Sequence, residues 1–219
     1  MNRRTLLALA PCALALLVAP PGAARAQPAA AVLTVQDRAD LARIEAYLDG
    51  LHTLKGRFLQ VASDGQTAQG EAWLERPGRL RFQYDPPSPL LLVAGHGLVV
   101  FHDSELNQTS NFPLSSTPLG ILLADHVKLS GNVTVTAIAR EPGQIQVTMV
   151  RTASPGDGSL TLIFADQPLA LRQWAVVDAQ GRETRVSLFN IEYGGTFDPK
   201  LFEYVARLPN GPGAGGGNH

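Results

Sequence analysis

The chain has 219 residues, of which 45% are hydrophobic and 17% charged, with a formal net charge of −1 and a single cysteine. This length is sufficient for one substantial domain with its own core. A near-neutral chain without clusters of lysine and arginine is poorly suited to binding nucleic acid, so we expect no nucleic-acid partner.

Residues 1–26 have the features of a secretory signal peptide. Arg3 and Arg4 give a positive start, an apolar run over residues 6–18 follows, and residues 24–26 form a small-x-small cleavage site. The apolar run is too short to span a membrane permanently. We therefore predict export, by either the general or the twin-arginine route. The mature chain would start at Gln27, with 15 basic and 19 acidic residues and a net charge of −4.

Cys12 leaves two alternatives open. Cleavage after Ala26 would remove it, and the mature chain would then have no disulfide and no thiolate chemistry. Cleavage before Cys12 would leave an acylated cysteine at the new N-terminus and anchor the protein to a membrane. Pro11, directly before the cysteine, argues against this second cleavage.

Residues 34–51 are predicted to form a helix. Thr34 and Asp37 have the spacing of a capping box, and Gly50 lies near the expected end. The apolar residues fall mostly on one stripe, which predicts a helix packed on a sheet. They are Val35, Leu41, Ile44, Tyr47, Leu48 and Leu51.

The rest of the chain reads as short alternating strands between glycine- and proline-containing turns, a pattern typical of antiparallel hairpins. No long linker or shift in composition divides it. The predicted class is therefore α+β, mainly β, in a single domain over residues 27–209. A glycine-rich tail, predicted to be disordered, covers residues 210–219.

The segment from residue 70 to residue 87 contains two strands around the turn Arg76-Pro77-Gly78. Alternation places Arg76 at the end of a strand, on the same face as Leu74. A cation in that position needs a specific partner if it is buried. The alternative is that the side chain bends out into water.

Residues 115–124 form a second predicted helix, which is almost wholly apolar. Ser115, Ser116 and Thr117 could cap its start, and Pro118 suits the first helical turn. Such a helix must be covered on most sides or must lie over an apolar cavity.

The sequence contains no recognisable catalytic constellation. His102, Asp103 and Ser104 are consecutive, so on a strand they alternate between faces and cannot form a triad. The histidines lack metal-ligand spacing. We therefore expect no enzyme activity, metal or cofactor, although carboxylates that converge in space, as in an exported hydrolase, remain an alternative.

Four segments together resemble the family of the outer-membrane lipoprotein carrier protein LolA. They are residues 51–60, 70–87, 117–123 and 171–181, and their order and spacing agree over residues 41–204. The resemblance implies an incomplete antiparallel β-barrel, or half-barrel, closed by a helical lid over a hydrophobic cavity.

The resemblance also assigns roles to particular residues. The lipid-binding cavity would be lined by Phe58, Leu74, Leu80, Phe82 and Tyr84. The lid would contain Leu119, Ile121, Leu122 and Leu123. Arg76 would be a latch that donates hydrogen bonds to lid carbonyls and holds the empty form closed.

The implied function is that of a monomeric periplasmic carrier for the acyl chains of lipoproteins. It would take acylated lipoproteins from an inner-membrane ABC transporter and pass them to an outer-membrane receptor. The related receptor LolB is an alternative if Cys12 is acylated. A periplasmic lipoprotein-sensing or interaction module with the same half-barrel is another.

Overall fold

The computed structural model describes residues 29–205, so the predicted signal peptide and glycine-rich tail lie outside the described part. Eleven strands form one antiparallel sheet in the order β6-β5-β4-β3-β2-β1-β11-β10-β9-β8-β7. The strands are β1 (Thr53–Val61), β2 (Thr67–Glu75), β3 (Arg79–Tyr84), β4 (Leu90–Gly95), β5 (Leu98–Asp103), β6 (Gln108–Pro113), β7 (Val133–Glu141), β8 (Gln144–Arg151), β9 (Gly158–Asp166), β10 (Leu169–Asp178) and β11 (Glu183–Tyr193).

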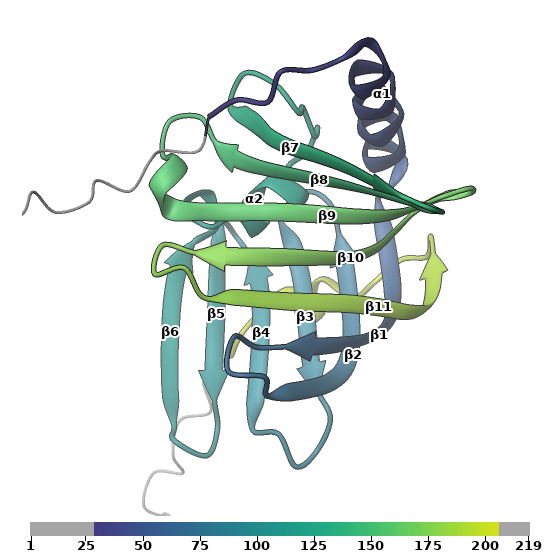
Figure 1. The fold of residues 1–219 in the computed structure, drawn as a ribbon. Helices are drawn as coiled ribbons and strands as arrows, with labels where there is room; N and C mark the ends of the chain where they lie inside the picture. Colours follow the sequence, from purple (N-terminus) through teal and green to yellow (C-terminus); the bar gives the residue numbers. More distant parts are fainter. Residues whose placement is uncertain (1–28, 206–219) are drawn as a thin grey trace, which may run out of the picture.

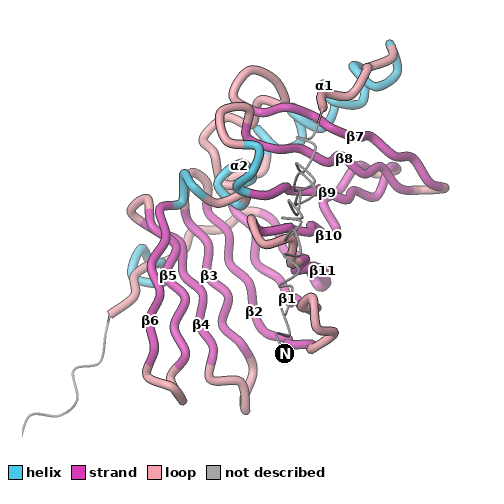
Figure 2. Tube along the Cα trace, turned by 60° about the vertical axis from the view of Figure 1, so that its left-hand side comes forward, coloured by secondary structure: helices cyan, strands magenta, loops and turns pink. Residues whose placement is uncertain are grey.

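The sheet is strongly bent and is not closed. In Figure 1, β3 to β6 run vertically behind β8 to β11, which cross them from side to side; Figure 2 shows the same bend from a second direction. The first and last strands of the sheet, β6 and β7, are not paired with each other. The mainly β architecture with few helices is thus as predicted.

The long helix α1 (Val35–Gly50) stands beside the ends of β7 and β8 (Figure 1). Its capping box forms as predicted: the Thr34 side chain accepts from the Asp37 backbone amide, and the Asp37 carboxylate accepts from the Thr34 amide. Val35 was assigned to the apolar stripe, but it is 82% exposed. The buried residues of the first helical turns are instead Asp37 and Asp40, which pair with Arg140 of β7.

The second helical segment is shorter than predicted. It consists of the 3-10 helix η1 (Leu114–Ser116) followed by the four-residue helix α2 (Leu119–Leu122). No side chain caps α2. The hydroxyls of Ser116 and Thr117 donate backwards, to the carbonyls of Pro113 and Leu114, and so cannot cap the helix as expected.

One hydrophobic core fills the concave side of the sheet. It contains residues of both helices and of strands from both halves, including Ile44, Phe58, Leu122 and Trp174. None of the helices in the described part is long and apolar enough to cross a bilayer.

The chain after β11 crosses the convex side of the sheet. A 3-10 helix, η3 (Pro199–Phe202), contacts β3 and β4, and Arg81 donates to the Leu201 carbonyl at 3.1 Å. Gly95 allows this close approach, because a methyl group there would collide with the carbonyl oxygen of Phe202. A further 3-10 helix, η2 (Pro155–Asp157), connects β8 to β9.

Candidate functional site

Arg76 follows β2 on the concave face, in line with Ala72 and Leu74, and only 8% of it is exposed. Burial lowers its pKa, and the nearby negative charges of Asp49 and Asp125 oppose that effect. The guanidinium of Arg76 is therefore buried on the apolar face, and the alternative that its side chain extends into solvent is wrong.

The buried guanidinium joins two parts of the chain that are far apart in sequence. At the C-terminal end of α1 it donates to the carbonyls of Leu48 and Leu51, the latter at 3.4 Å. After α2 it donates to Ala124 at 2.9 and 2.6 Å and to Asp125 at 3.0 Å. All four acceptors are backbone carbonyls at or just after the end of a helix, so the buried charge is satisfied by backbone oxygens.

The five residues assigned to the cavity wall lie together on the concave face. Phe58, Leu74, Leu80, Phe82 and Tyr84 are each at most 3% exposed. Phe58 stacks on Phe82 with ring centroids 4.4 Å apart, and the Tyr84 ring meets Phe58 edge-on at 5.1 Å. In this conformation the aromatic side chains pack against one another, so their positions are those of a filled core.

The four residues assigned to the lid lie against this core. Ile121, Leu122 and Leu123 are buried, and the half-buried Leu119 packs against the same cluster. The backbone amide of Gly78, in the turn after Arg76, donates to the Leu123 carbonyl at 2.8 Å. Below, the word lid names residues 114–125 after the role predicted for them. This segment is attached to the β2–β3 turn by both side chain and backbone.

Two acidic residues of α1 hold the chain that follows the lid, and the sequence reasoning missed both. Asp49 accepts a hydrogen bond from the Val127 amide at 3.1 Å, and Glu45 accepts one from the Leu129 amide at 2.7 Å. No sequence motif predicts such contacts, because the hydrogen-bond partners are backbone amides 78 and 84 residues away in the chain.

A second arginine reaches the lid from the other half of the sheet. Arg151, the last residue of β8, donates from Nη2 to the Thr117 carbonyl at 3.0 Å. Alternation could have identified it, because it continues the buried series Ile145, Val147 and Met149, as Arg76 continues Ala72 and Leu74.

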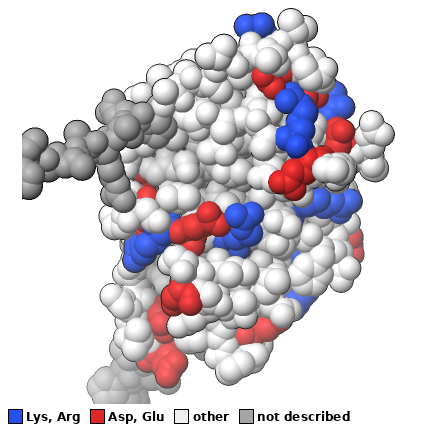
Figure 3. Space-filling view, viewed as in Figure 1, with Lys and Arg blue, Asp and Glu red and all other residues white. Residues whose placement is uncertain are grey.

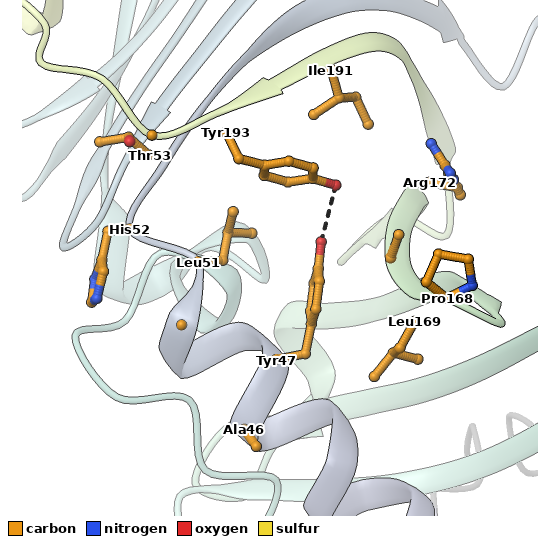
Figure 4. A pocket seen from close by; sticks show the side chains of 13 residues that line it. Ala46, Tyr47, Leu51, His52, Thr53, Pro168, Leu169, Arg172, Ile191 and Tyr193 are labelled. Carbon is orange, nitrogen blue, oxygen red and sulfur yellow. Dashed lines mark hydrogen bonds between the residues drawn. The ribbon is translucent and has the colours of Figure 1, made fainter.

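A pocket of about 780 Å³ opens beside the C-terminal turn of α1 (Figure 4). The helix, the start of β10 and the end of β11 supply its walls, and the hydroxyls of Tyr47 and Tyr193 meet across it at 3.2 Å. None of the five predicted wall residues lines it. Its lining residues are Ala46, Tyr47, Gly50, Leu51, His52, Thr53, Pro168, Leu169, Ala170, Arg172, Ile191, Tyr193 and Gly194.

The consecutive residues His102, Asp103 and Ser104 lie at the end of β5. His102 is held by the hydroxyls of Tyr204 and Thr109, at 2.9 and 3.0 Å, on the convex side. No group of three or more potential metal ligands occurs within residues 29–205. On the face shown in Figure 3, acidic and basic side chains alternate and do not gather in a patch of one sign.

A family model and relatives in sequence indicate the same family. A family model described as "Outer membrane lipoprotein carrier protein LolA" matches residues 49–205. The chain is 31% identical to an outer-membrane lipoprotein carrier protein of Methylococcus capsulatus, over 74% of this chain and 81% of the relative. It is 27% identical to one of Azotobacter vinelandii, over 80% and 87% respectively. A LolA superfamily protein of Nitrosomonas europaea has a solved structure with a TM-score of 0.42 and 7% identity, over 75% of this chain and 97% of that one. This chain belongs to the LolA family of outer membrane lipoprotein carrier proteins.

Proposed function

We propose that this protein is a periplasmic carrier that shields the acyl chains of lipoproteins from water. Two relatives are named outer-membrane lipoprotein carrier proteins, and the concave face of this chain carries an apolar core against which residues 114–125 pack. At about 0.8 kcal/mol per CH₂ group, three acyl chains left in water cost on the order of 30 kcal/mol. An acylated protein therefore needs a soluble partner to cross an aqueous compartment.

In this proposal, the conformation in which the aromatic residues pack against one another is the closed, empty state of the carrier. Acyl chains would take the place of the contacts that Phe58, Phe82 and Tyr84 now make with one another and with the lid. Such contacts are non-directional, so flexible chains can replace them without any loss of hydrogen bonds.

The bonds of Arg76 are the observation on which the proposal mainly depends. One guanidinium joins the end of α1 to the end of the lid, so these two elements cannot separate while it stays in place. Loading would break these bonds, and the tendency to restore them would favour release of the cargo. Arg76 is in this sense the latch.

The pocket beside α1 could be the entrance through which acyl chains reach the proposed lipid-binding cavity. Leu51 contributes both a wall of the pocket and a carbonyl acceptor for Arg76. Movement of this turn would therefore open the pocket toward the core at the moment the latch is released. The cargo would be received from an inner-membrane ABC transporter and passed to an outer-membrane receptor, with no cofactor in the carrier itself.

A two-protein transfer assay tests this function. We expect the Arg76→Leu variant to load a lipoprotein but to release it poorly to the receptor. Arg79→Leu is the matched control, because Arg79 pairs with Glu75 at the surface, beside the same turn. Normal release by Arg76→Leu, or equal defects in both variants, would count against the latch.

A further inference from the structure

The side chain of Arg151 is half-buried at the end of β8, against the lid. Gly120 lies in the lid directly above it, and a methyl group there would come within 2.6 Å of Nη2 of Arg151 and would also collide with the Leu114 carbonyl. The glycine in the otherwise apolar run Leu119–Leu123 thus gives the guanidinium room to reach the backbone of the lid.

The bonding of Arg151 is incomplete. Its Nη2 donates to the Thr117 carbonyl at 3.0 Å, but its Nε is buried without a hydrogen-bond partner in the described structure. A buried donor without a partner costs free energy, which the fold tolerates here in order to keep the arginine beneath the lid. Packing alone would have been satisfied by an apolar side chain.

Arg76 and Arg151 hold opposite ends of the lid. Arg76 comes from the β2–β3 turn and binds the carbonyls of Ala124 and Asp125, whereas Arg151 comes from the end of β8 and binds that of Thr117. The lid is therefore tied to both halves of the bent sheet, and the two ties differ in strength. Arg76 makes three hydrogen bonds to carbonyls of the lid and two more to carbonyls at the end of α1, whereas Arg151 makes one, to the lid.

We propose that Arg151 is a second latch, which ties the Thr117 end of the lid to the β7–β9 half of the sheet, and that the lid opens at this end first. The inference rests on the proposed function for its biological meaning, because an opening lid matters only if the core beneath it receives a ligand. In a carrier, the single hydrogen bond of Arg151 would break before those of Arg76. The Thr117 end of the lid would then move away from the sheet while Arg76 holds the other end in place.

Residue-resolved amide hydrogen exchange on the purified, ligand-free protein tests the proposal. Three backbone amides report on the N-terminal end of the lid, because each is hydrogen-bonded within it: those of Thr117, Gly120 and Ile121. In Arg151→Gln we expect them to exchange on the order of tenfold faster, as for loss of one charge-assisted bond, while the amides of β7 to β9 keep their protection. In Arg151→Lys, which keeps a cationic donor, we expect most of the protection to remain.

Arg182→Gln is the matched control, because Arg182 lies in the exposed β10–β11 turn and pairs only with neighbours there. The wild-type protein should also show faster exchange at Gly120 than at Ala124. The second latch would be overturned if the lid amides of Arg151→Gln exchanged at the wild-type rate. It would also be overturned if the amides of β7 to β9 exchanged faster by the same factor as those of the lid. Slower exchange at Gly120 than at Ala124 would overturn the order of opening.

A parallel titration with a fluorescent fatty-acid analogue separates this inference from the proposed function. If the lid responds as expected but neither the wild-type protein nor the variant binds the analogue, Arg151 remains a latch and the carrier function fails. If the analogue binds the wild-type protein but lid exchange is insensitive to Arg151, the carrier function stands and the second latch fails.

Discussion

The carbonyl oxygen of Ala124 accepts two hydrogen bonds from Arg76, one from Nε at 2.9 Å and one from Nη2 at 2.6 Å. The same guanidinium reaches the Leu51 carbonyl at the end of α1. A single side chain thus satisfies backbone acceptors on two elements, and both are covered by the same hydrophobic core. Arg76 thereby joins the end of α1 to the chain that follows α2.

Phe82→Ala should lower the free energy of unfolding by about 3–5 kcal/mol. The ring stacks on Phe58 and lies 6.0 Å from the Trp174 ring, so its removal leaves a void between the two halves of the sheet. Urea unfolding followed by fluorescence measures the loss. A saturating fatty-acid analogue should restore part of it in the variant, because the ligand would fill the void. A loss below 1 kcal/mol would mean that this core is already loosely packed.

Tyr47→Phe should destabilise the fold by about 1–3 kcal/mol. The Leu171 amide lies where the register of β9 and β10 shifts, and it donates to the Tyr47 hydroxyl at 3.1 Å. Removing the hydroxyl leaves that amide without this acceptor. Tyr193→Phe is the control: it removes the other hydroxyl of the pair but, because Tyr193 is 53% exposed, should change stability by less than about 0.5 kcal/mol. Equal effects of the two substitutions would contradict the assignment.

Gly95→Ala should detach the C-terminal segment from the convex side of the sheet. The new methyl group would displace the Phe202 carbonyl and expose Val93, which is now buried. Limited proteolysis should then cut near Leu201 much faster, and stability should fall by about 1–3 kcal/mol. Gly50→Ala is the matched control, since a methyl group there meets nothing within 4 Å. Unaltered proteolysis would show that the segment adjusts without leaving the sheet.

The attachment of α1 to β7 should weaken in acid. Hydrogen bonds from the Thr34 side chain and backbone, together with that from Arg140, lower the pKa of Asp37 to about 2. Burial alone would raise the pKa of Asp40, but its bonds from Arg140 and Gln36 outweigh this effect and lower it. Since the folded values lie below the unfolded value of about 3.9, this stabilisation is complete above about pH 4 and is lost as the pH falls toward 2.

Urea midpoints measured between pH 6 and pH 2 check this prediction. Asp37→Asn should show a smaller fall across that range than the wild-type protein. Glu105→Gln, at an exposed position outside the ion pairs of the described residues, should follow the wild-type curve. Parallel curves for all three proteins would contradict the assignment of this acid sensitivity to α1.

Local sequence patterns predicted much of this structure. The capping box identified the start of α1, and alternation placed Arg76 on the same face as Leu74, as observed. These features depend on neighbours within a few residues, which is why periodicity reveals them. The resemblance to the LolA family, and not periodicity, supplied the residues assigned to the cavity wall and the lid, and these lie in the buried core.

Features that depend on distant partners were not predictable in the same way. Asp37 and Asp40 are buried at the start of α1 because Arg140 lies opposite them, and Val35 is consequently turned outward. Periodicity also cannot distinguish a filled core from a hollow one, since both require the same inward-facing residues. The role of Arg151 follows the alternation rule but depends on Gly120, which reads in sequence only as a weak helix residue.

Native mass spectrometry of the protein purified from the periplasm of its host without detergent tests the carrier function most directly. We expect a fraction of the molecules to carry an acylated polypeptide, and this fraction should grow when a lipoprotein is overproduced. We also expect an unmodified chain beginning at Gln27. A protein that remains free of acylated cargo even when a lipoprotein is overproduced would contradict the proposed carrier function.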